Sequence, residues 1–187
     1  MTGRQPQDII VEADNSCRVY TKEREIRLKM KTLVAYFSPT GTTAAVAERL
    51  AEAVGADIFE IEPKKHYTEE DLNWWDSESR SSKEMKDPSS RPETSRVRDN
   101  MADYDVIALG FPIWWGKAPT IVNTFLEEHD FTGKAIVPFA TSGGSGYGNT
   151  NASLAESCKG AELKEGIIFP YDVSMDELRG WFDEKKK

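Results

Sequence analysis

The residue types in one short segment, residues 38–43, suit the binding of a phosphate group. Hydroxyl side chains and the free backbone N–H groups of a helix start both donate hydrogen bonds to anions, and a glycine lets the backbone approach them closely. The segment contains no Lys or Arg, which suits a phosphate monoester held by neutral donors and the helix dipole. A helix cap without a ligand is the alternative. The six residues are Ser38, Pro39, Thr40, Gly41, Thr42 and Thr43.

Two further segments suit a planar aromatic ring. Residues 111–119 contain two adjacent indoles between two prolines, and indole faces stack on aromatic ring systems. Residues 141–148 contain four glycines, which would expose backbone N–H and C=O groups to a flat polar edge. The alternatives are a core or partner-facing tryptophan pair and a plain flexible turn. The predicted ring-binding residues are Pro112, Ile113, Trp114, Trp115, Gly116, Thr141, Ser142, Gly143, Gly144, Gly146 and Tyr147.

The elements around these segments alternate between strand and helix. Apolar runs predict strands at residues 32–37, 57–61, 105–110, 134–140 and 166–169, and helical patterns lie at 43–54, 118–128, 150–158 and 175–184. This alternation predicts an α/β protein with a parallel sheet and helices on both faces. Ligands of such sheets bind beyond the carboxyl ends of the strands. The three segments therefore sample one site.

Residues 62–103 are too many for a simple crossover between two strands. They contain a capped helix pattern that starts at Thr68, the adjacent Trp74 and Trp75, a break near residues 88–92 and a second helical pattern near 93–102. Long excursions of this kind are usually functional or disordered, and the tryptophan pair argues against disorder in the first half. Arg80 either closes over a ligand or is a solvated charge.

Composition excludes several classes of function. The 187 residues include 24 Lys and Arg but 32 Asp and Glu, and this acidity disfavours nucleic acid and membrane surfaces as partners. Every apolar run falls well short of a membrane span of about 20 residues. Two distant cysteines without a CxxC motif favour a reduced, cytoplasmic setting, and two histidines make a zinc site improbable. Residues 1–29 lack apolar periodicity and are predicted to be a poorly ordered extension of a 30–187 domain.

The combination of the three loops resembles the flavodoxin family. Residues 38–43 are similar to that family's phosphate loop for flavin mononucleotide (FMN), and residues 111–119 and 140–148 look like its two ring-binding loops. Residues 71–82 are similar to a segment of one bacterial flavodoxin-like subgroup. The resemblance implies a doubly wound five-stranded parallel sheet of strand order 2-1-3-4-5 in three α/β/α layers. It also implies non-covalent FMN and electron transfer. The negative net charge would attract a redox partner protein with a basic docking face.

Other functions share this scaffold. An NAD(P)H-dependent FMN-containing quinone or flavin reductase is the main alternative, with residues 62–103 as a substrate lid. A receiver-type signalling module needs acidic residues after the first and third strands, where Ser38 and Phe111 stand instead. A flavin-dependent sensor without a redox partner also stays open. Neither a GxGxxG nor a Walker pattern fits the glycines.

Overall fold

The sheet is parallel throughout. The computed structural model describes residues 30–187, so the extension predicted over residues 1–29 lies outside the described residues. The strands are β1 (Thr32–Tyr36), β2 (Asp57–Glu60), β3 (Val106–Pro112), β4 (Ala135–Thr141), β5 (Glu162–Leu163) and β6 (Ile167–Ile168). Their order is β2-β1-β3-β4-β5, with β6 also paired to β4. The predicted order 2-1-3-4-5 is confirmed.

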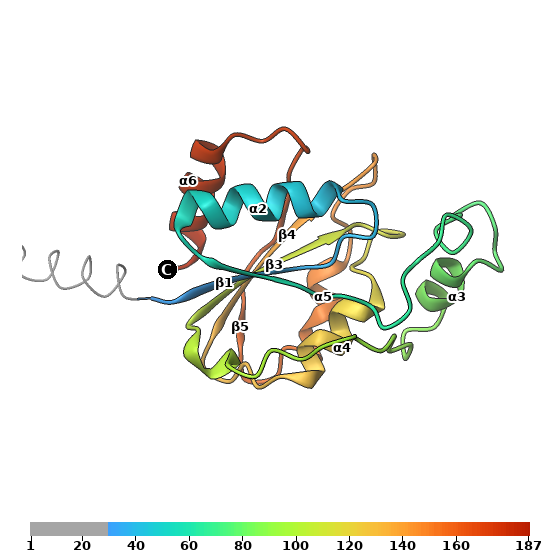
Figure 1. Cartoon of the computed structure of the whole chain (residues 1–187), viewed down its shortest axis with the longest axis horizontal. Helices are drawn as coiled ribbons and strands as arrows, with labels where there is room; N and C mark the ends of the chain where they lie inside the picture. Colours follow the sequence, from blue (N-terminus) through green and yellow to red (C-terminus); the bar gives the residue numbers. More distant parts are fainter. Residues whose placement is uncertain (1–29) are drawn as a thin grey trace, which may run out of the picture. The chain divides into compact units, whose positions relative to one another are not determined.

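Helices cover both faces of the sheet. The helices α2 (Thr42–Val54) and α6 (Met175–Lys185) lie on one face, and α4 (Thr120–Glu128) and α5 (Thr150–Ala155) lie on the other (Figure 1). A capping box between Ser174 and Glu177 starts α6. The predicted three layers are therefore present. No helix within residues 30–187 is long and apolar enough to cross a membrane.

Unbroken apolar sequence places the central strands in the core. β1, β3 and β4 have their apolar residues buried on both faces, as expected for a sheet covered by helices on each side. Gly110 pairs with Phe139 across β3 and β4, and a Cβ at Gly110 would overlap the Phe139 ring. A side chain larger than hydrogen at position 110 would push this ring out of the core.

The fifth strand differs from its prediction. It was expected as one strand over residues 166–169, but two short strands, β5 and β6, pair with β4 and leave residues 164–166 between them. The reason lies in the neighbouring segment. Asn151 donates a hydrogen bond to the Lys164 carbonyl, and the Tyr147 side chain lies against Gly166. These contacts occupy the backbone where a continuous strand would run.

Residues 62–103 form an arm whose helical content was wrongly predicted. Thr68 and Asp71 do make the expected reciprocal cap, but only turns follow it, and the helix α3 (Arg80–Lys86) begins nine residues later. Side chains explain this correction, because Asn73 and Asp76 accept hydrogen bonds from backbone N–H groups two residues ahead. These bonds favour turns over a helix.

The second helix predicted on the arm, near residues 93–102, is also wrong. Thr94 forms an isolated bridge with Pro63, and the backbone N–H of Ser95 donates to the Glu62 carbonyl at 2.8 Å. Only the short 3-10 helix η1 (Met101–Asp103) is helical there. Pairing with the start of the arm therefore overrides the local helical preference. This pairing ties the two ends of the arm together.

Candidate functional site

The three predicted loops meet at the carboxyl edge of the sheet. The hydroxyls of Thr43 and Thr141 share a buried hydrogen bond of 2.8 Å, which joins the first loop to the third. The backbone N–H of Ile113 donates to the Thr141 carbonyl at 2.8 Å, which joins the second loop to the third. All three loops thus lie together at one edge of the sheet, as their positions after β1, β3 and β4 predicted.

The first loop forms a cluster of hydrogen-bond donors at the start of α2. Ser38 accepts a hydrogen bond from the backbone N–H of Ala44 at 3.0 Å, which folds the loop over the first turn of the helix. Gly41 has a φ of 83°, a left-handed conformation that few other residues adopt. Within residues 30–187, four consecutive backbone N–H groups donate to no acceptor: those of Thr40, Gly41, Thr42 and Thr43.

The hydroxyls of the first loop have two different roles. Those of Thr40 and Thr42 are on exposed residues, 3.4 Å from one another. Thr43 is 1% exposed, and its hydroxyl bonds Thr141, so its side chain joins loops and only its backbone N–H is available. The free donors and the positive end of the α2 dipole suit a phosphate group, and the donor set includes no cationic side chain.

The second loop is a tight turn with an unusual residue in it. Trp114 and Lys117 exchange both backbone hydrogen bonds, at 2.9 and 3.0 Å, around Trp115 and Gly116. The φ angles of Trp115 and Gly116 are 48° and 73°, as in a type I′ turn. Among residues 30–187, Trp115 is the only non-glycine residue with a positive φ. The fold therefore tolerates strain at Trp115 to present an indole that is 49% exposed.

The two adjacent indoles face different surroundings. Trp114 packs edge-to-face against Phe37, with ring centroids 5.8 Å apart, and against Tyr67, at 5.5 Å. Trp115 makes no ring contact with another aromatic side chain in the described part of the chain. The sequence allowed either stacking on a ligand or burial for this pair. Trp114 takes the packed position, and Trp115 stands at the tip of the turn.

The third loop presents mainly backbone. Ser142 holds it closed by donating to the Ser145 carbonyl at 2.7 Å and accepting from the N–H of Gly144. The Tyr147 hydroxyl instead donates to Asn151 at 2.9 Å, and burial raises the pKa of this tyrosine. The Tyr147 side chain is therefore committed to the fold. All four glycines of the loop are exposed: Gly143, Gly144, Gly146 and Gly148.

A group on the arm was missed by the sequence analysis. The Tyr67 hydroxyl donates to Glu84 at 2.6 Å, and the Arg80 guanidinium lies 3.9 Å from the centre of the Tyr67 ring. Burial and the Glu84 carboxylate raise the pKa of Tyr67. Arg80 is neither solvated nor free to close over a ligand, because its Nε is 2.6 Å from Glu84 and its side chain is 18% exposed. The segment 71–82 contained this arginine, but its partner Tyr67 had no distinguishing sequence signal.

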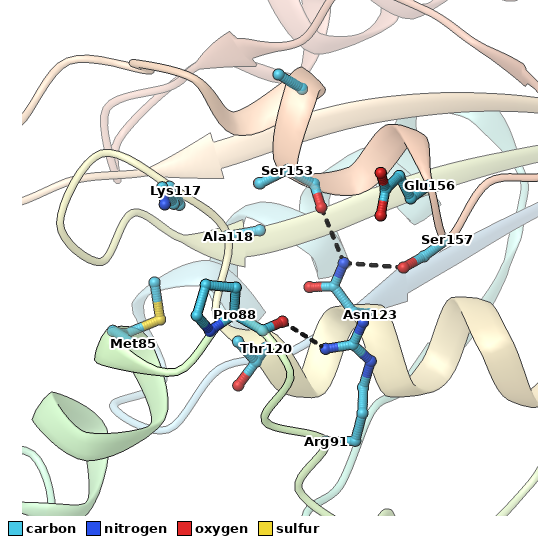
Figure 2. Close-up of a pocket in the computed structure, with 11 residues that line it drawn as sticks. Met85, Pro88, Arg91, Lys117, Ala118, Thr120, Asn123, Ser153, Glu156 and Ser157 are labelled. Atoms are coloured by element: carbon cyan, nitrogen blue, oxygen red, sulfur yellow. Dashed lines mark hydrogen bonds between the residues drawn. The ribbon is translucent and has the colours of Figure 1, made fainter.

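A pocket of about 210 Å³ adjoins the second loop. Its walls come from α4, α5 and the arm, and Figure 2 shows Lys117 and Ala118 of the second loop at one side. Asn123 is fixed in it by donating to the Ser153 carbonyl and the Ser157 hydroxyl (Figure 2). Arg91 pairs with Glu127 through two nitrogens at 2.8 and 2.9 Å. Within residues 30–187, no group of three His, Cys, Asp or Glu side chains is placed to hold a metal.

Fold and site define a doubly wound α/β protein with a donor-rich loop and an aromatic turn at the carboxyl edge of its sheet. The flavodoxin family profile matches residues 31–185. The chain therefore belongs to the flavodoxin family.

Solved structures resemble the same part of the chain. Candidate flavoproteins from Bacteroides eggerthii and Bacteroides uniformis are each 47% identical to it, with TM-scores of 0.78 and 0.77. Each alignment covers 82% of this chain, and it covers 96% and 98% of the respective relatives. A Lactobacillus acidophilus flavoprotein in complex with FMN is 20% identical over 74% of this chain and 92% of its own, with a TM-score of 0.61, and so shares the fold. No match was found among curated proteins.

Proposed function

We propose that this protein binds FMN non-covalently and transfers electrons. The observation that carries the proposal is the row of four free backbone N–H groups at the start of α2, next to two exposed hydroxyl residues and without a cationic side chain. This donor set fits a phosphate monoester. The exposed Trp115 and the glycine-rich third loop fit a planar ring beside it. The FMN complex of the Lactobacillus flavoprotein, which shares the fold, supports the same choice of ligand.

Each loop has a separate task in this proposal. The N–H groups of residues 40–43 and the hydroxyls of Thr40 and Thr42 bind the phosphate. Trp115 lines one side of the ring, and the backbone groups of Gly143, Gly144 and Gly146 bind its polar edge. FMN, when bound, supplies the electron-transfer chemistry, and the protein binds it, orients it and limits the access of water.

The partner in this proposal is a redox protein with a basic docking face, in the cytoplasm. The formal charge of −8 provides a field that attracts such a face. Attraction between exposed charges is screened within about 8 Å at physiological ionic strength, so added salt should slow the association.

A comparison of FMN with riboflavin tests the phosphate assignment. Riboflavin has the same ring system but lacks the phosphate, so only FMN can use the first loop. Hydrogen bonds to charged groups contribute about 1.5–3 kcal/mol each, and several of them should make FMN bind at least about 100-fold more tightly. Fluorescence titration of the apoprotein measures both affinities. Equal affinities would refute the proposed role of the first loop.

A reductase is the second candidate, favoured by one observation. The 210 Å³ pocket adjoins the second loop and has room for a small substrate. Stepwise reduction followed by visible absorbance separates the two functions, because a carrier takes up electrons in two resolved one-electron steps. We expect two such steps, and slow oxidation of NADH or NADPH with quinone as acceptor. Rapid oxidation of either nucleotide with a single two-electron step would favour the reductase.

A further inference from the structure

Tyr67 lies 47 residues before Trp114 in the chain but touches it in space. The rings of Tyr67, Phe37 and Trp114 meet pairwise edge-to-face, with centroids 5.5 to 5.8 Å apart. Phe37 is 1% exposed at the end of β1, so it provides a fixed wall. Trp114 is thus held between one ring of the sheet and one ring of the arm.

The Tyr67 ring is itself held from three directions. Its hydroxyl bonds one carboxylate oxygen of Glu84, and the other oxygen of Glu84 pairs with Arg80 Nε at 2.6 Å. The Arg80 guanidinium covers the ring face and also donates to the Lys65 carbonyl at 2.6 Å. Arg80 and Glu84 are four residues apart on α3, and their side chains are only 18% and 13% exposed. This closed set of contacts leaves Tyr67 little freedom to rotate.

Trp114 is also the first residue of the turn that presents Trp115. The Trp114 N–H donates to the Lys117 carbonyl, and the Trp114 carbonyl accepts from the Lys117 N–H. Trp114 therefore forms the base of the turn with its backbone and packs against Tyr67 with its ring. Trp115 is in a left-handed conformation and relaxes unless its surroundings prevent this. A fixed Trp114 ring supplies part of that restraint.

We propose that Tyr67, clamped by Arg80 and Glu84, is a positioning residue that fixes Trp114 and thereby the ring-binding turn. This inference rests on the proposed function for its ring-binding half. It assigns the arm a role in ligand binding without direct contact to the ligand. The aromatic contact with Trp114 connects Tyr67 to the ring-binding turn, and Tyr67 also lines a small pocket beside Ser38 and Pro39 of the first loop. The proposal assigns the effect of Tyr67 to the turn, so its loss should affect ring binding and not phosphate binding.

The test replaces Tyr67 by Leu and measures the affinities of FMN and riboflavin. An aromatic edge-to-face pair contributes enough for both affinities to fall by the same factor, about 3- to 10-fold. Tyr171→Leu is the matched control, because Tyr171 is 69% exposed and makes no aromatic contact within residues 30–187. A loss for FMN alone would overturn the proposal, since it would place the effect in the phosphate loop.

A double-mutant cycle with Trp114→Leu tests the route of the effect. If Tyr67 acts through Trp114, then Tyr67→Leu causes no further loss of affinity once Trp114 is replaced. An equal loss in both backgrounds would overturn the proposal. Tyr67→Phe keeps the ring and removes only the bond to Glu84, so it serves if the Leu variant does not fold. We expect Tyr67→Phe to lower the affinities for FMN and riboflavin equally. Wild-type affinity for both flavins would show that the bond to Glu84 is not required.

Failure of the proposed function is distinguishable from failure of this inference. Wild-type protein that binds neither flavin would refute the former. The near-ultraviolet circular dichroism of the ligand-free protein would still test the positioning role of Tyr67, because this signal reports the fixed surroundings of the tryptophans. We expect Tyr67→Leu to change the part of this signal that Trp114→Leu abolishes. An unchanged signal would overturn the positioning role.

Discussion

The first and second loops of the site are built in different ways. In the first loop, seven consecutive residues supply both the free donors and the helix cap, in which the Ala44 N–H donates to the Ser38 hydroxyl. The second loop depends on distant residues: Tyr67 packs on Trp114, and the Gly116 carbonyl accepts from the N–H of Asn149 at 3.1 Å. The donors of the proposed phosphate site are thus arranged mainly by neighbouring residues, with one distant bond from Thr43 to Thr141, whereas the proposed ring site depends on tertiary contacts. Changes far away in the chain should therefore damage ring binding and spare phosphate binding.

The largest effect is expected from Gly148→Ala. Gly148 has a φ of 56°, and a Cβ there would overlap the carbonyl oxygen of Gly116. Overpacking against a rigid backbone and a left-handed alanine together should lower the free energy of unfolding by about 2–4 kcal/mol. Denaturant unfolding measures this loss. The variant should also bind riboflavin more weakly.

Gly143→Ala is the control for this prediction. No atom lies within 4 Å of a Cβ at position 143, and its φ is not left-handed. We expect its stability to match the wild type, although both glycines lie in the same loop. Similar losses for the two variants would show that the third loop, rather than its contact with Gly116, determines stability.

The next effect belongs to the first loop and should be confined to the phosphate. Thr40→Ala and Thr42→Ala each remove one exposed hydroxyl without touching the fold. Loss of one hydrogen bond to a charged group should weaken FMN binding about 10- to 100-fold. Riboflavin affinity should stay unchanged, which fluorescence titration can measure on the same preparations. A parallel loss of riboflavin affinity would contradict the separation of the two loops.

This difference between the loops also explains what the sequence could predict. The strands β1, β3 and β4 and the donor-rich loop of residues 38–43 rest on neighbouring residues, and their positions were predicted. The Thr68–Asp71 cap formed too, but the side chains of Asn73 and Asp76 turned the chain before a helix could begin. Local signals therefore compete, and one sequence does not show which of them prevails.

The contacts of the ring site could not be predicted in this way. Tyr67 and Trp114 are separated by most of the arm and by β3, and no spacing rule relates them. The same holds for Tyr147, which was assigned to the site but whose side chain lies against Gly166. Such pairs depend on how the elements pack. The roles of the seventeen predicted site residues remain predictions for binding experiments.

The smallest effect concerns the strain in the second loop and has the opposite sign. Trp115 adopts a left-handed conformation, which asparagine tolerates better than tryptophan. The indole is 49% exposed, so its removal costs little burial, and Trp115→Asn should raise the free energy of unfolding by about 0.5–1 kcal/mol. Trp115→Ala removes the same indole but keeps the unfavourable backbone, so it should bring no such gain. Both variants should weaken riboflavin binding to the same extent, because both lack the indole that is proposed to line the flavin. A gain in stability together with unchanged riboflavin affinity would mean that the strain at Trp115 serves something other than ring binding.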